Sequence, residues 1–491
     1  MKKLFAIMLV LVMALSLVAC GGDAQPAATT EPAGQTTTTP AASDQVLVGF
    51  GAGNITPDWP IGLQGYGNAS TRISTGKKTD IFIYCVAVTD TEGETILLIG
   101  TDSGSGSDKH IRACVSDASG VPMDHFIVSS VHQHSVPSMT SQFVELLQKR
   151  AKEAVQQALD DRAPAKMYLN TVETMAMSFV RHYIANDPAG SLVGDNYNDA
   201  IGSAYGYKGH ESESDKEMRL VKFEREGKKP IIMVNFQAHP HMGAGANDTN
   251  VHGDWPAIMR ELVAEKLDAH CVYFSGAGGN LNSTSRIEEE NISTDFKDHG
   301  RRAANYVTKA EKTYVEAELG DVKVLSKTIA YENDHSMDHL GDIATQLNNL
   351  RAKDFNAARE EVKKYSDIHS IYHAEAIVEK IAAGPTRELT IGAFAIGDVV
   401  FTYHPYEMFD TNGMELRAGT VGNENYLPDE QLENPYKMTF ICTLGNGHLG
   451  YVPSQLGYTN GGYSTDITYF APGSGERLVG DYLQILNELH G

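Results

Sequence analysis

The chain has 491 residues, 42% of them hydrophobic, and is therefore long enough to bury a large core. Asp and Glu number 63 against 40 Lys and Arg, and the resulting net charge of -23 argues against a nucleic-acid partner. The same acidic balance offers no basic patch for anionic lipid head groups.

The N-terminus has the pattern of an export signal. Two lysines follow the first methionine, residues 4–15 form an apolar stretch, and Leu17-Val18-Ala19 precedes Cys20. This arrangement is typical of a signal peptide and is too short for a transmembrane span. A cysteine at this point resembles the lipobox of bacterial lipoproteins, so residues 1–20 are expected to be a lipoprotein signal peptide with a lipid anchor on Cys20. The alternative is a cleaved soluble signal followed by a chance cysteine.

The segment after the signal is expected to be a tether. Residues 21–45 are rich in Thr, Ala, Pro and Gly, a composition that cannot bury enough apolar surface to fold. We therefore expect a disordered linker between the lipid and the rest of the chain, and an extracytoplasmic protein anchored to a bacterial membrane.

Residues 46–491 alternate short β-branched runs with helical patterns. This alternation predicts one large α/β domain with layered, mixed β-sheets flanked by helices. Turn residues between paired apolar runs predict hairpins over residues 81–102 and 217–238. Apolar residues at helical spacing predict helices over residues 142–160, 258–267, 342–383 and 476–490.

Four cysteines follow the lipobox, and none of them forms a CxxC pair. Cys85, Cys271 and Cys442 lie in strand-like runs, whereas Cys114 does not. Buried thiols are therefore favoured over zinc ligands, and a disulfide stays open from the sequence alone.

Five apolar strands finish in polar side chains. Their ends carry, in chain order, His132 with His134, His239 with His241, the glycine-rich run 275–280, Glu407 and Tyr451. Ligand sites in open α/β sheets gather beyond the carboxyl ends of strands, so these segments are expected to converge.

The two histidine pairs raise the question of a metal. A histidine at a strand end is more often a hydrogen-bonded residue than a ligand, and His132 and His134 point the same way only if the strand persists. A second histidine pair and a carboxylate, Glu407, also lie at strand ends, and together they favour metal ligation over simple hydrogen bonding. Zinc takes imidazole nitrogen and carboxylate oxygen, and a catalytic zinc keeps a position open for water. The set predicts a zinc site.

Other polar features have ordinary structural explanations beside the functional ones. The run 275–280 could aim backbone amides at an oxyanion, or it could form a tight strand-to-helix turn. Asp254 precedes a predicted helix and is expected to cap it. Tyr451, Tyr458 and Tyr463 would ordinarily be half-buried packing residues.

Six segments, in order, resemble motifs of the neutral or alkaline, non-lysosomal ceramidases. GAGNITP…GLQGYG resembles the family's GxGxxDITgP…MxGY region, and SSVHQHS resembles THTHS. The later segments NFQAHPHM, SGAGGNLN, HPYEMF and GYVPSQLGYTNGGYS resemble, respectively, NWFAVHPTSM, xxGDVSP, PGEPF and GYVTTxEEYxxxxYEG. The resemblance covers the chain from Val46 onward. It implies that this part of the chain corresponds to the catalytic, N-terminal domain of that family, here in a bacterial lipoprotein.

The resemblance also implies roles for individual residues. One zinc ion would be held by His132, His239, Glu407 and Tyr451. His134 would lie beside the metal-bound water or the oxyanion.

Two further positions match substrate-side residues of the family, and one departs from its pattern. Arg181 and Tyr463 fall where the family places residues that contact substrate. Asn282 stands where the family has a serine often assigned as nucleophile, and Ser283 follows one place later.

The leading hypothesis is a lipid-anchored, zinc-dependent amidohydrolase in which zinc-bound hydroxide cleaves the N-acyl amide of a ceramide-like substrate. A second hypothesis keeps the fold and the metal but changes the bond to an ester, an acetyl group or a small polar amide, which Asn282 and the acidic surface favour. A third is a surface lipoprotein that binds a ligand without turnover. An enzyme that had lost its activity would be expected to lose these ligands, so the presence of His132, His239 and Glu407 argues against the third hypothesis.

Overall fold

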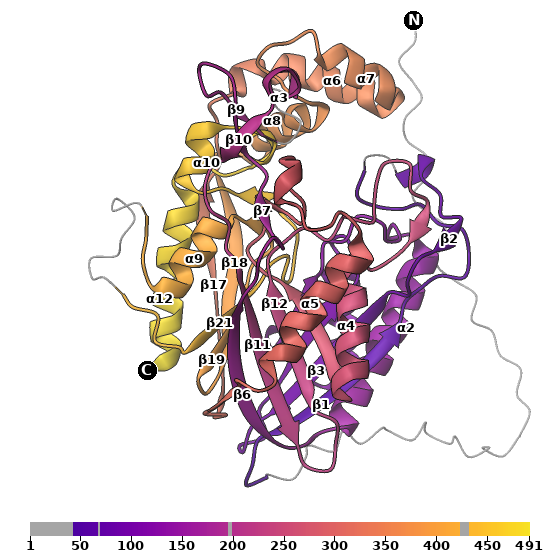
Figure 1. Ribbon diagram of the computed structural model, residues 1–491, viewed down its shortest axis with the longest axis vertical. Helices are drawn as coiled ribbons and strands as arrows, with labels where there is room; N and C mark the ends of the chain where they lie inside the picture. The colour runs from indigo at the N-terminus through magenta and orange to yellow at the C-terminus, as the bar shows by residue number, and fades with distance from the viewer. Residues whose placement is uncertain (1–42, 67–68, 195–198, 423–431) are drawn as a thin grey trace, which may run out of the picture. The chain divides into compact units, whose positions relative to one another are not determined.

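The computed structural model describes residues 43–66, 69–194, 199–422 and 432–491 (Figure 1). The predicted signal peptide, Cys20 and nearly all of the tether lie outside these residues. The described residues belong to one compact unit that spans residues 39–491. Within them, no helix is both long and apolar enough to cross a bilayer.

Two β-sheets form the centre of the unit. The larger has nine strands in the order β14-β12-β11-β6-β1-β3-β4-β5, with β16 paired to β6. Its strands are β1 (Leu47–Asn54), β3 (Phe82–Thr89), β4 (Thr95–Thr101), β5 (Phe126–Ser130), β6 (Ala163–Glu173), β11 (Glu217–Arg225), β12 (Ile231–Phe236), β14 (His270–Ser275) and β16 (Val315–Ala317). The smaller sheet has the order β17-β18-β19-β21. Its strands are β17 (Val322–Glu332), β18 (Thr386–Ile396), β19 (Val399–Tyr403) and β21 (Met438–Cys442).

The two sheets pack face to face, and strands such as β12, β19 and β21 are buried on both faces. Along β3, Val86 and Val88 point into the core between the sheets, which Phe394 and Phe401 fill from the smaller sheet. Cys85 directly precedes Val86, so it points to the opposite face of β3, toward helices. Burial on both faces explains why these strands read as nearly continuous apolar runs.

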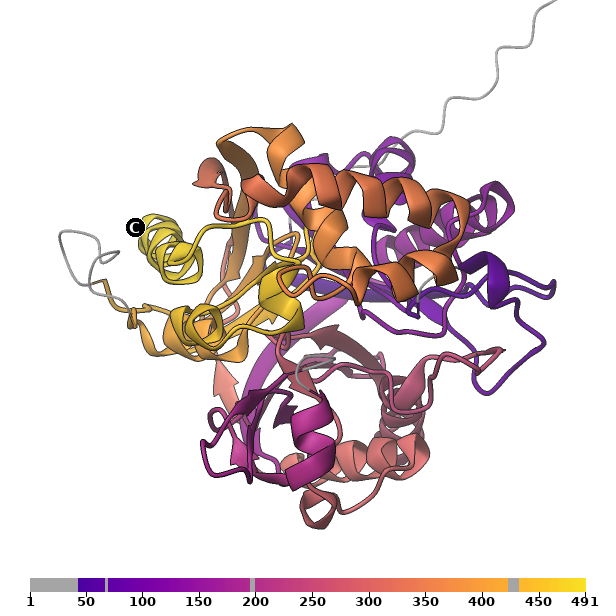
Figure 2. The same cartoon turned by 90° about the horizontal axis from the view of Figure 1, so that it is seen from above.

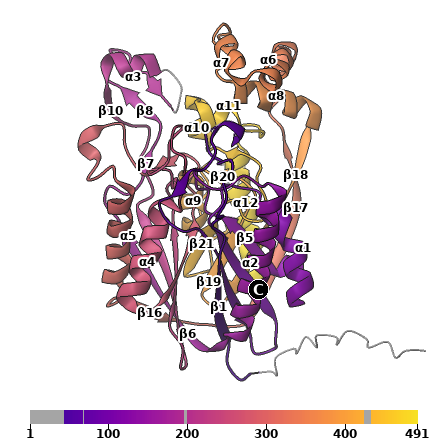
Figure 3. The same ribbon diagram turned by 90° about the vertical axis from the view of Figure 1, so that its right-hand side faces the viewer.

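Helices cover the outer faces of both sheets, giving the order helix, sheet, sheet, helix (Figures 1 and 3). The larger sheet is covered by α1 (Asp108–Ser119), α2 (Ser141–Asp160), α4 (Asp254–Leu267) and α5 (Phe296–Ala310). The smaller sheet is covered by α9 (Asp410–Ala418) and α12 (Ser474–His490). The predicted fold class, layered mixed sheets flanked by helices, is confirmed.

The predicted hairpins are confirmed, and one helical prediction changes in detail. The pairs β3/β4 and β11/β12 are antiparallel, as their turns indicated. Residues 342–383 form three helices, α6 (Gly341–Lys353), α7 (Phe355–Val362) and α8 (Ile371–Ala383). The breaks fall where Asp354 and Ser370 turn their side chains onto the first backbone N–H groups of the next helix.

The expectation that Asp254 caps a helix is wrong. Gly253 occupies the cap position, and Asp254 is the first residue of α4, with a positive φ of 53°. Its buried carboxylate instead accepts hydrogen bonds from the N–H groups of Gly243 and Trp255. Asp254 therefore ties the loop after His241 to the start of α4.

The four cysteines in the described part of the chain are free. Cys85, Cys271 and Cys442 are buried in β3, β14 and β21, as their apolar surroundings indicated. Burial raises the pKa of each of these thiols, so they are packing residues.

Short elements gather at one end of the sheets, where α6–α8 also lie (Figures 1 and 2). They are β7 (Phe179–Val180), β8 (Tyr183–Ala185), β9 (Leu192–Val193), α3 (Asp199–Tyr205), β10 (Tyr207–His210), β15 (Leu281–Asn282), β20 (Glu407–Met408), β22 (Tyr451–Val452), α10 (Gln455–Asn460) and α11 (Tyr463–Asp466). The helices α6–α8 have a small hydrophobic core of their own and connect β17 to β18.

Candidate metal centre

The polar strand ends converge, as the sequence predicted. The strands β12 and β14 run parallel, as do β19 and β21, so their carboxyl ends open toward the same end of the sheets. A small cavity there is lined by side chains from all of these segments, including His132, His239, Ser275, Glu407 and Thr443.

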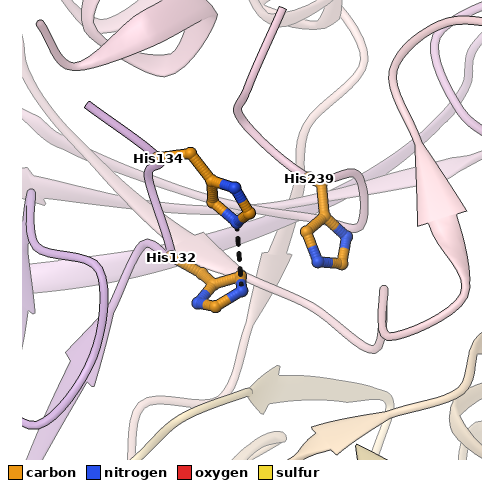
Figure 4. Close-up of side chains that lie close together, drawn as sticks. All are labelled: His132, His134 and His239. Atoms are coloured by element: carbon orange, nitrogen blue, oxygen red, sulfur yellow. Dashed lines mark hydrogen bonds between the residues drawn. The ribbon is translucent and has the colours of Figure 1, made fainter. Parts of the chain in front are cut away.

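His132 lies at a turn rather than in a continuing strand. β5 ends at Ser130, and His132 has a positive φ of 65°, a conformation that costs a non-glycine residue energy and that recurs at functional sites. The turn brings the two imidazoles together, so that His132 Nε2 and His134 Nε2 are 3.4 Å apart (Figure 4). The pair converges because of the turn, so the expectation that the two side chains point the same way only in a continuing strand is wrong.

His132 and His239 are oriented in the same way. The Nδ1 of His132 donates to the carbonyl of Gly104 at 2.9 Å, and the Nδ1 of His239 donates to the carbonyl of Leu281 at 2.8 Å. A neutral imidazole with its proton on Nδ1 presents a lone pair at Nε2. Metal-bound histidines are commonly held by such a bond from the other ring nitrogen.

Both Nε2 lone pairs point at one carboxylate oxygen. Glu407 Oε2 lies 3.0 Å from His239 Nε2 and 3.4 Å from His132 Nε2. Ligand atoms of His132, His134 and His239 also lie within 4.8 Å of one another, as three ligands of one metal ion would (Figure 4). Three imidazoles and one carboxylate thus surround a single point.

The charges and hydrogen-bond acceptors at this point favour the binding of a cation. Burial alone would raise the pKa of Glu407, but the neighbouring imidazoles outweigh it and hold that pKa at about 2. Burial lowers the pKa of His132 to about 4, so at neutral pH an ionised carboxylate faces a neutral imidazole. His239 Nε2 and Glu407 Oε2 are buried without a hydrogen-bonding partner among the described residues. Two facing acceptors are unfavourable alone, and a zinc ion between them would satisfy both.

His134 is the third imidazole of the group. Burial, followed by the proximity of His132, lowers its pKa well below the ordinary value, so the ring is neutral. The ring of Tyr66 lies edge-on to it, with centroids 5.4 Å apart. Gly65 permits this packing, because a Cβ at that position would lie 2.5 Å from the backbone of His134. Gly65 and Tyr66 therefore pack directly against His134.

The structure places Tyr451 beside Glu407, with Arg181 against the tyrosine ring. Glu407 and Tyr451 are paired residues of the parallel strands β20 and β22. Burial and the charge of Glu407 raise the pKa of Tyr451 well above its ordinary value, so the phenol is protonated. The guanidinium carbon of Arg181 is 5.4 Å from the centre of the Tyr451 ring. Ligation by Tyr451 stays a prediction.

Tyr463 also lies beside this group. It begins α11, and its ring lies edge-on to that of Tyr451, with centroids 6.3 Å apart. The next residue, Ser464, accepts a hydrogen bond of 2.7 Å from Arg181. The two residues predicted to contact substrate are therefore neighbours, and their roles stay predictions.

Asn282 and Ser283 face different surroundings. Asn282 is half-buried at the end of β15, and its Oδ1 accepts a hydrogen bond of 3.1 Å from His241 Nε2. Ser283 is 2% exposed, and its hydroxyl donates to the backbone carbonyl of His239 at 2.9 Å. Ser283 thus supports the backbone of a predicted ligand, while Asn282 lies in the cluster of histidines.

The glycine-rich run 275–280 packs against neighbouring strands. The N–H of Gly276 donates to Phe236, and the N–H of Gly279 donates to Met408, at 3.0 and 2.8 Å. A Cβ on Gly279 would lie 2.6 Å from the carbonyl oxygen of Glu407, so only glycine fits. These two amides are engaged within the fold. The run is a tight turn, but it joins β14 to β15, so the expected strand-to-helix turn is wrong in its second element.

Sequence reasoning missed His448. Its ring stacks near that of His132, with centroids 6.5 Å apart, and it precedes Tyr451 by three residues in the run GNGHLGY. A lone histidine in a glycine-rich loop carries no spacing signal, so only the distance to His132 identifies it.

Solved structures of ceramidases share this fold. The crystal structure of neutral ceramidase from Pseudomonas aeruginosa aligns with a TM-score of 0.64 at 12% identity, over 91% of this chain and 74% of that one. A ceramidase complexed with C2 aligns with a TM-score of 0.65 at 13% identity, over 90% of this chain and 75% of that one. No protein-family model and no curated protein matches the sequence. The chain therefore has the mixed α/β fold of the neutral ceramidases.

Proposed function

We propose that the protein is a zinc-dependent hydrolase that cleaves the N-acyl amide bond of a ceramide-like substrate. The observation that carries the proposal is the meeting of His132, His239 and Glu407 around one point. The ceramidase fold supports the choice of an amide hydrolase.

His132, His239 and Glu407 would hold the zinc ion, with Tyr451 as the fourth protein ligand. Bound zinc lowers the pKa of a coordinated water to about 7 and polarises carbonyl oxygens. The backbone carbonyls of Gly104 and Leu281 fix the two imidazoles in the tautomer that ligation requires.

The remaining residues act on the substrate. His134 and Asn282 are the proposed donors to the oxygen of the scissile carbonyl as it gains negative charge. Because Asn282 Oδ1 accepts from His241, its NH2 group is the end left to face the substrate. Arg181, held by Ser464, and Tyr463 would bind and orient the N-acyl group.

One observation favours a second candidate function. Asn282 replaces the family's serine, and the neighbouring Ser283 is buried against His239 and cannot reach a substrate as it stands. A hydrolase of the same fold and metal that acts on an ester, an acetyl group or a small polar amide would suit this change equally well. A ligand-binding lipoprotein without turnover would show no hydrolysis of any of these substrates.

The test combines metal analysis with a substrate panel. The purified chain is expected to contain zinc and to hydrolyse at least one N-acyl substrate, with activity lost on chelation and restored by zinc. His125 gives a matched control, since it lies just before β5 while His132 lies just after it. His125→Ala should keep both zinc and activity. A zinc-free protein, or activity that survives chelation, would overturn the proposal.

We also propose that the mature protein is attached to a bacterial membrane through a lipid on Cys20. The pattern of residues 1–20 supports this assignment, and the acidic chain offers no basic patch as a second membrane anchor. The catalytic unit would then act outside the cytoplasm on substrates near the membrane surface.

A further inference from the structure

A second group of potential metal ligands lies away from the first centre. His369, His373 and Asp466 place one ligand atom each within 4.8 Å of one another. His369 Nδ1 is 2.8 Å from Asp466 Oδ2, and the rings of the two histidines have centroids 5.4 Å apart. Two imidazoles and a carboxylate are a donor set that suits zinc and related divalent transition metals.

The two histidines are held in place by the start of α8. Ser370 caps this helix by accepting from the backbone N–H of His373, which places His369 and His373 on either side of the cap. His373 is 2% exposed, whereas the side chains of His369 and Asp466 are 29% and 13% exposed. The group is therefore buried at His373 and open to solvent at His369 and Asp466, where an ion can enter.

A neighbouring pair shows what an ordinary histidine–carboxylate contact looks like here. His335 Nδ1 lies 3.0 Å from Asp338 Oδ2, within one short segment and on the surface. In the region of α6–α8, the group around His373 differs by its second imidazole, by burial and by joining two distant parts of the chain.

We propose that His369, His373 and Asp466 form a second divalent-metal site that clamps α8 to α11. Asp466 is the last residue of α11, and Tyr463 is its first. Tyr372 lies between the two histidines in sequence, and its ring is edge-on to that of Tyr463 with centroids 6.4 Å apart. A metal ion here would fix the helical segment against the element that carries Tyr463.

The second site is tested by measuring zinc stoichiometry in a variant whose first centre has lost a ligand. In the full chain with His239→Ala, which weakens the first centre, incubation with zinc followed by desalting should leave about one equivalent bound. Adding His373→Ala should remove that equivalent. Asp466→Asn, which keeps the shape of the side chain, should do the same if the carboxylate is a ligand.

The matched control is His335→Ala, which should keep the zinc of its parent. Amide hydrogen exchange provides a second measurement. Zinc should slow exchange in α11 and at the start of α8, and this slowing should be absent in His373→Ala. Unchanged zinc content in both His373→Ala and Asp466→Asn would overturn the second site. Failure of the first centre would appear separately, as equal zinc content in the wild type and His239→Ala.

Discussion

Asn282 is the position where the chemistry of this site can be tested most directly. Replacing it by alanine removes an NH2 group that we assign to the oxyanion, together with the hydrogen bond of 3.1 Å to His241. Loss of one oxyanion donor typically lowers turnover by about 100-fold to 1000-fold, which corresponds to about 3 to 4 kcal/mol of activation free energy. We expect Asn282→Ala to fall in that range.

The effect on folding should be far smaller. Losing one partly buried hydrogen bond costs about 1 kcal/mol of unfolding free energy. Ser283→Ala loses a hydrogen bond as well, the one from its hydroxyl to the carbonyl of His239. It should therefore match Asn282→Ala in stability to within about 1 kcal/mol while leaving turnover nearly unchanged.

The assay is steady-state hydrolysis of the best substrate from the panel, with zinc content and thermal unfolding measured on each variant. Asn282→Asp sharpens the result, because it keeps the size of the side chain and its acceptor for His241 but has no NH2 group. It should lose as much turnover as Asn282→Ala. Complete loss of activity in Ser283→Ala, together with an acyl group trapped on Ser283 in the wild-type protein, would show that a serine nucleophile has moved by one residue and that our assignment is mistaken.

The other predictions concern metal, anchor and pH. His132→Ala and His239→Ala should each strip zinc from the first centre without unfolding the chain, and retention of stoichiometric zinc there by either variant would show that the ligand set is wrong. Cys20→Ser should release the protein from the membrane fraction, whereas unchanged fractionation would exclude the anchor. Burial lowers the pKa of His404 from 6.5 to about 3. The unfolded chain therefore binds a proton there that the folded chain does not, and unfolding free energy should decline as pH falls from about 6.5 towards 3, less steeply in His404→Phe, as denaturation at several pH values can show.

The sequence by itself determined much of the local structure. The turn residues between two apolar runs predicted the antiparallel pair β3/β4, because a short turn joins neighbouring strands. Polar residues at the ends of apolar runs predicted where a site would form. These inferences depend on short-range geometry, which the spacing of residues encodes.

The tertiary structure decided how the strand-end residues meet. The sequence left open whether His132 and His134 converge, and the positive φ of His132 settles it. The glycine-rich run could have supplied oxyanion donors, but the amides of Gly276 and Gly279 are engaged by neighbouring strands. In each case the answer depends on which backbone groups lie opposite, and a pattern of side chains along one segment does not contain that information.

The contact between His369 and Asp466 shows the same limit. The two residues are 97 positions apart, and no periodicity joins them. An apolar pattern tells which face of an element is buried, but the element that covers that face is selected by the packing of the whole domain. The first candidate metal site was therefore readable from the sequence, whereas the grouping of His369, His373 and Asp466 required the fold.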